Sequence, residues 1–173
     1  MAIKIGITGS NGFVGYHLYQ TLHLLKDEFL LRNFERTFFE DKHKLDSFVA
    51  SCDVIVHLAA LNRHNDLELI YNTNVSLVNK LVQSLERTAS KAHIIISSST
   101  QEERDNLYGK SKKEGRLLFS SWANQSGGRL SGLIIPNVFG PFGHPYYNSV
   151  IATFCHQIAR NETPKIDIDG DLK

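Results

Sequence analysis

A tyrosine and a lysine that could handle one proton together lie four residues apart, at Tyr108 and Lys112. The surrounding pattern predicts a helix, which places both side chains on one face. A phenol with an undisturbed pKa of about 10 is a poor base at neutral pH, and a nearby ammonium favours its ionised form. Such a tyrosine can exchange a proton with an alcohol oxygen while a hydride moves at the adjoining carbon. The spacing alone is also common between unrelated surface residues.

Hydroxyl groups precede this pair in the run Ser97-Ser98-Ser99-Thr100. The apolar residues before the run predict a buried strand. Hydroxyls at the carboxyl end of a parallel strand face the crevice where ligands bind, although a serine cluster by itself is often only a turn. We expect Ser99 to polarise a substrate carbonyl.

Three glycines, Gly9, Gly12 and Gly15, connect a short apolar run at the N-terminus to a helical pattern. A strand, a glycine turn and a helix in this order aim unpaired backbone N–H groups at a phosphate. Gly9 permits the sharp turn, Gly12 has no Cβ to obstruct a pyrophosphate, and Gly15 lets helix and strand pack closely. An ordinary strand-to-helix turn is the alternative, and the order of the elements favours a dinucleotide site.

The ends of the next two predicted strands bear on the cofactor. A strand over residues 29–34 ends beside Glu35 and Arg36. A carboxylate there binds the ribose hydroxyls of NAD, whereas an arginine accepts the extra phosphate of NADP. Because of Arg36 we favour NADP as the cofactor, with NAD as the alternative. A strand over residues 53–58 ends in Ala59-Ala60, whose small side chains let a cofactor lie against the backbone or simply allow tight packing.

Predicted strands and helices alternate along the 173 residues. This order indicates one α/β domain with a doubly wound parallel sheet between two layers of helices, a Rossmann fold. A helix expected over residues 67–87 carries Asn74 among its apolar positions, where a buried amide must find hydrogen-bond partners. A short helix over residues 44–51 with a vestigial strand before it, and a strand starting at Ile166 and Ile168, complete the pattern.

The composition excludes several classes of function. Nineteen basic and 18 acidic residues give a net charge of +1, which offers no electrostatic case for binding nucleic acid or an anionic membrane. No apolar run is long enough to span a membrane and the chain begins with a core strand, so we expect a cytoplasmic protein without a signal peptide. The eight histidines form no ligand cluster, so no metal is expected, and Cys52 and Cys155 are expected to be buried thiols.

The chain resembles the extended short-chain dehydrogenase/reductase superfamily, also known as the NAD-dependent epimerase/dehydratase family. The matching motifs run in the family's order: Thr8-Gly9-x-x-Gly12-x-x-Gly15, His57-Leu58-Ala59-Ala60, Asn74, Ser97-Ser98-Ser99, Tyr108-x-x-x-Lys112 and Pro136-Asn137-Val138-Phe139-Gly140-Pro141. The resemblance implies an enzyme of nucleotide sugars in which Tyr108 transfers a proton, Lys112 positions the cofactor and Ser99 binds the carbonyl. Ser98 or Thr100 takes the part of Ser99 if the motif is shifted by one residue. Asn74 completes the implied catalytic set by stabilising its helix.

The same resemblance implies which residues contact ligands. The implied cofactor contacts are Gly9, Asn11, Gly12, Phe13, Val14, Gly15, Arg36, Leu58, Ala59, Ala60, Lys112 and Asn137. The implied substrate contacts are Arg63, Thr100, Asn137, Asn148 and Ser149. The two long helices that contain Asn74 and Tyr108 form dimer faces in many relatives, so a homodimer is expected.

Residues 94–116 and 148–162 resemble more specifically the reductase domain of CapF-type capsular polysaccharide enzymes. Those enzymes reduce UDP-linked 4-keto-6-deoxy sugars with NADPH, so we expect the same class of reaction in surface polysaccharide biosynthesis. The chain stops at Lys173, which suggests an N-terminal fragment with the cofactor half and the start of the substrate-binding subdomain. The alternatives are an epimerase or dehydratase with tightly held NAD, and a non-catalytic dinucleotide-binding module. A dehydratase would need an acid near Ser99, where Glu102 and Glu103 are expected in a solvated loop.

Overall fold

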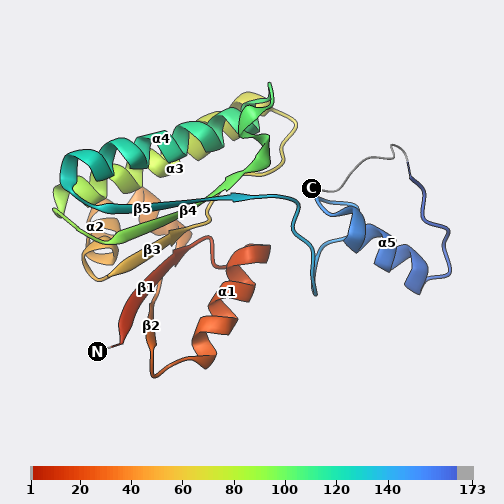
Figure 1. Cartoon of the computed structure of the whole chain (residues 1–173), viewed down its shortest axis with the longest axis horizontal. Helices are drawn as coiled ribbons and strands as arrows, with labels where there is room; N and C mark the ends of the chain where they lie inside the picture. Colours follow the sequence, from red (N-terminus) through yellow and green to blue (C-terminus); the bar gives the residue numbers. More distant parts are fainter. Residues whose placement is uncertain (1, 167–173) are drawn as a thin grey trace. The chain divides into compact units, whose positions relative to one another are not determined.

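The structure, a computed structural model, describes residues 2–166. Its larger unit, which ends at Ile134, is built on a five-stranded sheet with the strand order β2-β1-β3-β4-β5 (Figure 1). The strands are β1 (Ile3–Thr8), β2 (Phe29–Arg32), β3 (Val54–His57), β4 (His93–Ser99) and β5 (Arg129–Ile135). β1 pairs in parallel with β2 and β3, and β3 pairs in parallel with β4. The predicted parallel sheet is therefore confirmed, and the carboxyl ends of these four strands meet at one edge.

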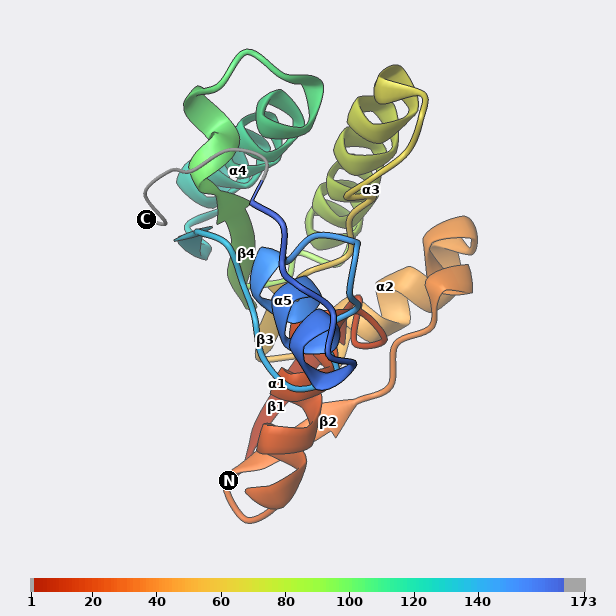
Figure 2. The same ribbon diagram turned by 90° about the vertical axis from the view of Figure 1, so that its right-hand side faces the viewer.

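Helices cover both faces of this sheet, as predicted. The helices of the larger unit are α1 (Phe13–Leu24), α2 (Lys42–Ala50), α3 (Leu67–Arg87) and α4 (Leu107–Ser126). α2, α3 and α4 enclose one core that contains Ile55, Ile94 and Trp122, whereas α1 packs over Ile7 on the opposite face. Figure 2 shows α3 and α4 on the same side of the sheet, where they pack against each other. The three-layer Rossmann arrangement follows from these two cores.

Short polar side chains define where most of the helices begin. Asp41 caps α2, Asp66 caps α3 and Asn106 caps α4, each by accepting hydrogen bonds from backbone N–H groups of the first turn. α4 ends at Gly127, which takes the left-handed conformation with φ +68°. The Asn106 cap fixes the start of α4, which carries Tyr108 and Lys112.

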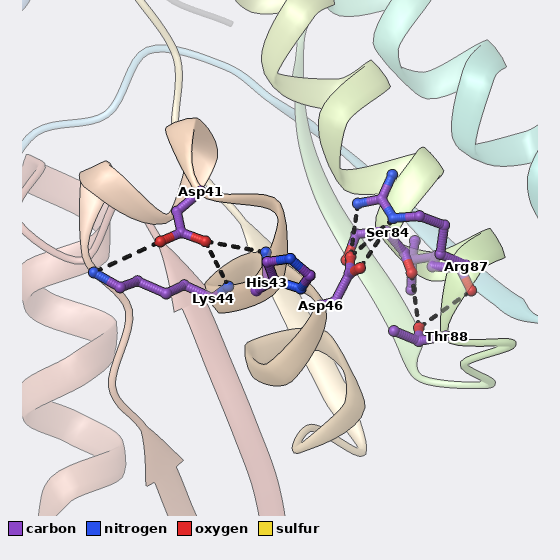
Figure 3. Close-up of polar contacts among 8 residues, drawn as sticks. Asp41, His43, Lys44, Asp46, Ser84, Arg87 and Thr88 are labelled. Carbon is purple, nitrogen blue, oxygen red and sulfur yellow. Dashed lines mark hydrogen bonds and ion pairs between the residues drawn. The ribbon is translucent and has the colours of Figure 1, made fainter.

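An ion pair ties α2 to α3 at the end of the helices away from the glycine turn. The guanidinium of Arg87 contacts the Asp46 carboxylate at 2.6 Å, and the Ser84 hydroxyl donates to the same carboxylate at 2.7 Å (Figure 3). The hydrogen bond from Arg87 holds the pKa of Asp46 below its ordinary value. Leu81 and Leu85 on α3 are fully buried near this ion pair. The ion pair and the buried leucines together hold α2 and α3 against each other on one face of the sheet.

The predicted vestigial strand before α2 is wrong. Residues Arg36–Glu40 form a 3₁₀ helix, η1, and α2 follows it directly from Lys42. The ring of Phe34 packs against Phe38, Phe39 and Phe48 with centroid distances of 4.8–5.5 Å. This aromatic contact draws the segment back onto the core and away from the edge of the sheet.

Residues from Ile135 onward belong to a second, smaller unit that contains α5 (Val150–Ala159). The Ser149 hydroxyl caps α5 by accepting a hydrogen bond from the Ala152 N–H at 3.2 Å. Cys52 is buried as expected, but Cys155 on α5 is exposed, which corrects that expectation. Ile166 lies in no strand, and Ile168, the second residue of the strand expected there, is outside the described residues.

Candidate active site at the carboxyl edge of the sheet

The glycine turn joins β1 to α1 under tight steric limits. Gly9 has φ +80°, and a Cβ added to it would lie 2.7 Å from the Ala59 nitrogen. A Cβ on Gly15 would lie 2.1 Å from the Gly9 oxygen, so α1 can approach the turn only because this position is glycine. A Cβ on Gly12 would meet only the Gly9 oxygen, at 3.3 Å, so this residue borders open space. The three glycines therefore have different functions, and Gly12 is the one that leaves room for a ligand.

The N-terminus of α1 differs from those of the other α-helices. Gly12 occupies its N-cap position, and no side chain accepts a hydrogen bond there. Each of the other α-helices in residues 2–166 has a side-chain cap. The first N–H groups of α1 are therefore left without a side-chain partner, and the positive end of the helix dipole favours an anion beside them. Open space at Gly12 together with this helix end fits the diphosphate of a dinucleotide.

The turn lies at the point where the strand order reverses, between β1 and β3. Thr8 Oγ1 and His57 Nδ1 share a hydrogen bond of 2.8 Å that joins the last residues of these two strands. Ala59 N also donates to Thr8 Oγ1, at 3.4 Å. Burial, with a smaller effect from Lys112, lowers the pKa of His57 to about 3, so the ring is neutral. We did not predict this link, although Thr8 and His57 both belong to the matching motifs.

Lys112 reaches the same edge of the sheet from α4. Its side chain is buried, and Nζ donates to Ser97 Oγ at 3.4 Å. Burial lowers the pKa of Lys112 to about 8, while the charge of Glu102 acts in the opposite direction. A cavity of about 10 Å³, with His57 and Asn74 in its lining, adjoins Lys112 and has room for one water molecule. Ser97 is the partner of Lys112 that we did not single out from the sequence.

The serines at the end of β4 divide between two directions. The Ser98 hydroxyl donates to the Glu102 carboxylate on the α4 side of the sheet, so its proton is not free for a ligand. Side chains alternate along a strand, which places Ser97 and Ser99 on the face opposite Ser98. Ser99 Oγ accepts the Gln101 N–H at 3.1 Å, which leaves its own O–H group able to donate to a ligand. Thr100 begins a 3₁₀ helix, η2 (Thr100–Glu103), and is exposed.

Tyr108 lies in the first turn of α4 and is half-buried. Burial raises the pKa of its phenol, and no charge from Lys112 offsets this, contrary to the expectation from the sequence. The phenol is therefore protonated at neutral pH in this structure and is ready to donate rather than to accept a proton.

Asn74 finds the partners that a buried amide requires. Its Oδ1 accepts the Leu61 N–H at 2.7 Å, and its Nδ2 donates to Leu61 O at 3.2 Å and to Ser111 Oγ at 3.0 Å. The side chain thus connects α3 with both the segment after β3 and the residue preceding Lys112. These contacts hold Lys112 in position relative to Ala59 and Ala60.

The remaining residues predicted to contact ligands differ in exposure and are divided between the two units. Asn11, Val14, Arg36 and Arg63 are exposed, and Phe13 and Leu58 are partly buried. Asn137, Asn148 and Ser149 belong to the smaller unit, where Ser149 caps α5. Residues 2–166 contain no group of histidine, cysteine or acidic side chains that could hold a metal ion. None of the helices within the described residues is both long and apolar enough to cross a membrane.

A family model described as the NAD dependent epimerase/dehydratase family matches residues 5–173. The chain belongs to the NAD-dependent epimerase/dehydratase family. A curated relative, UDP-2-acetamido-2,6-beta-L-arabino-hexul-4-ose reductase of Pseudomonas aeruginosa, is 33% identical over 160 residues. That match covers 92% of the chain but only 42% of the relative, so the chain spans less than half the length of this reductase.

Solved structures of the family have the same fold. The capsular polysaccharide assembling protein CapF of Staphylococcus aureus is 33% identical, with a TM-score of 0.77 over 96% of this chain and 43% of CapF. The protein RMD of Pseudomonas aeruginosa, solved in complex with NADPH, has a TM-score of 0.81 at 23% identity, over 92% of this chain and 61% of that protein. The CapF match agrees with the resemblance noted in the sequence, and the RMD match supports the fold alone.

Proposed function

We propose that the protein is the cofactor-binding part of an NAD(P)-dependent reductase of a nucleotide-activated 4-keto-6-deoxy sugar. The observation that carries this proposal is the uncapped glycine turn at the same sheet edge as Lys112 and the hydroxyls of Ser97 and Ser99. The ketone reductase and CapF among its relatives support a keto-sugar substrate and a place in surface polysaccharide biosynthesis. A homodimer and a substrate-binding subdomain that starts near Ile135 are parts of the same proposal.

In this mechanism each residue has a limited task. A bound nicotinamide cofactor supplies the hydride. The free O–H group of Ser99 donates to the substrate carbonyl and stabilises the charge that grows on its oxygen. Tyr108, which is protonated at neutral pH, gives its proton to that oxygen. Lys112, whose ammonium donates to Ser97 Oγ at 3.4 Å, has the task of positioning the nicotinamide ribose.

Tyr108→Phe is expected to lower the rate of keto-sugar reduction about 100- to 10,000-fold, because the substitution removes the proton donor and little else. Steady-state reduction of a UDP-linked 4-keto sugar, followed by loss of NADPH absorbance, measures this effect. The dissociation constant for NADPH should change less than about twofold, since the diphosphate binds at the glycine turn. Equal rates for the variant and the wild type would contradict the assignment, and they are the result expected of a non-catalytic module.

Arg36→Ala is expected to weaken NADPH binding about 10- to 100-fold and to leave NADH binding unchanged, because only NADPH carries a phosphate for the guanidinium. Arg36 is exposed and follows β2 at the cofactor edge, whereas Arg32 already donates to Ser51 O at 3.2 Å. Titrations of both nucleotides, read by cofactor fluorescence, measure the two constants. Equal losses for the two nucleotides would show that Arg36 does not select NADP, and NAD bound throughout purification would favour an epimerase.

A further inference from the structure

Glu102 is buried, although the sequence placed it in a solvated loop. Glu102 is only 6% exposed, whereas the neighbouring Glu103 is exposed and pairs with Lys113 at 3.2 Å. Glu102 lies in η2, three residues after Ser99 and six residues before Tyr108. A buried carboxylate between two residues of the proposed site requires a physical reason, because burying an unpaired charge is costly.

Both oxygens of Glu102 have partners from separate elements. Ser98 at the end of β4 donates to Oε1, and Arg116 of α4 donates to both oxygens at 2.6–3.2 Å. The stem of Arg116 passes over Gly132 of β5, where an added Cβ would lie 2.8 Å from Arg116 Cδ. The carboxylate therefore joins the end of β4 to the third turn of α4, and the small size of Gly132 gives the Arg116 stem its room.

Further contacts hold η2 against the first turn of α4. The backbone of Gly109 approaches Gln101 so closely that an added Cβ would lie 2.0 Å from the backbone oxygen of Gln101. Asn106 Nδ2 donates to Gln101 Oε1 at 3.4 Å, in addition to capping α4. Glu102 is the one charged member of this set that is buried, so we expect the set to depend on it most.

We propose that Glu102 is a positioning residue that locks the β4–α4 connection and so holds Ser99 and Tyr108 toward the same substrate carbonyl. This inference rests on the proposed reductase function, but the lock itself is a property of the fold. Glu102 touches neither ligand in this role and acts through Ser98 and Arg116.

The same contacts bear on the type of reaction. The hydrogen bonds from Arg116, assisted by the one from Ser98, hold the pKa of Glu102 below its ordinary value, so the carboxylate is ionised at neutral pH. An acid that expels a hydroxyl group in a dehydration must carry a proton and must be able to reach the sugar. Glu102 meets neither condition, so it is not the acid of a dehydration at this site.

Glu102→Gln tests the lock, because glutamine keeps the shape and removes the charge that Arg116 binds. Amide hydrogen exchange in peptides that cover residues 98–110 is expected to quicken at least about tenfold, while peptides covering residues 5–20 are unchanged. The rate of keto-sugar reduction is expected to fall about 10- to 100-fold with the NADPH dissociation constant within about twofold of the wild type. Glu103→Gln, which removes the adjacent exposed glutamate, is the matched control and should resemble the wild type in all three measurements.

Each outcome decides one part of the inference. Exchange in Glu102→Gln equal to that of the wild type would overturn the lock, and faster exchange with full turnover would overturn the positioning role. If Glu102→Gln does not fold, Glu102→Gln/Arg116→Met removes both charges and should restore folding but not turnover. Exchange decides the lock even if the wild-type protein reduces no keto sugar, a result that would overturn only the proposed function.

Discussion

Lys112→Met is expected to raise the free energy of unfolding at pH 7 by up to roughly 3 kcal/mol while it abolishes catalysis. Burial lowers the pKa of Lys112 from 10.5 to about 8. Below pH 8 the lysine is charged in both the folded and the unfolded state, so the full cost of burying the charge is present. Between about pH 8 and 10.5 only the unfolded state holds the proton, so the stability of the wild type rises with pH. The advantage of methionine therefore shrinks across that interval.

Urea unfolding at pH 7 and at pH 10 measures this difference. His57, Ser97 and Glu102 are the polar or charged groups of β3, β4 and η2 that act on Lys112, and none of them is removed by the substitution. Lys113→Met is the matched control, because Lys113 is half-exposed in a surface pair with Glu103 and should change stability by less than about 0.5 kcal/mol. A Lys112→Met variant that is less stable than the wild type at pH 7 would show that burial of the Lys112 charge does not destabilise the fold.

The three glycines of the turn are expected to fail in different ways when replaced by alanine. Gly15→Ala should lower the free energy of unfolding by about 3 kcal/mol or more, because its Cβ would overlap the Gly9 backbone. Gly9→Ala should be similarly damaging, since it combines a close approach to Ala59 with φ +80°. Gly12→Ala should lose at most about 1 kcal/mol of stability, because its φ of −79° suits alanine and its Cβ would meet only the Gly9 oxygen, at 3.3 Å. It should nevertheless bind NADPH roughly 10- to 100-fold more weakly.

Thermal unfolding and cofactor titration of the three variants separate these effects. Gly127→Ala is the control for backbone strain alone, since Gly127 has φ +68° with no atom within 4 Å of an added Cβ. It should lose about 1 kcal/mol of stability and keep full cofactor affinity. A Gly12→Ala variant with unchanged affinity would place the diphosphate elsewhere and remove the main support for the proposed function.

The fold could be predicted from the sequence because its signals are local. The apolar run at Ile94-Ile95-Ile96 and the helical pattern around Asn74 each follow from the period of one element. The glycine turn was recognisable for the same reason, since the spacing of Gly9, Gly12 and Gly15 is a local signal, although the close contact of Gly9 with Ala59 is not local. The segment over residues 36–40 was mistaken for a strand because the aromatic contact with Phe48 that shapes it is not local.

The details of the site depend on contacts between distant elements, and the sequence does not specify those. Ser97 rather than Ser99 meets the Lys112 ammonium because of how α4 lies across the end of β4. The burial of Glu102 depends on Arg116, 14 residues further along the chain. One signal could have revealed the pair: a glutamate between a serine run and a helix that carries an arginine two turns beyond Tyr108.

Because no side chain caps the N-terminus of α1, cofactor binding at the proposed site should also contribute to the stability of this helix. A side-chain cap of the kind found on α2, α3 and α4 contributes about 1 kcal/mol to a helix. The uncapped α1 lacks this contribution, and an anionic cofactor bound at the proposed site would supply the missing hydrogen-bond acceptor. Without a bound nucleotide, α1 should consequently fray first at residues 12–15, and under the proposed function nucleotide binding would stabilise this turn.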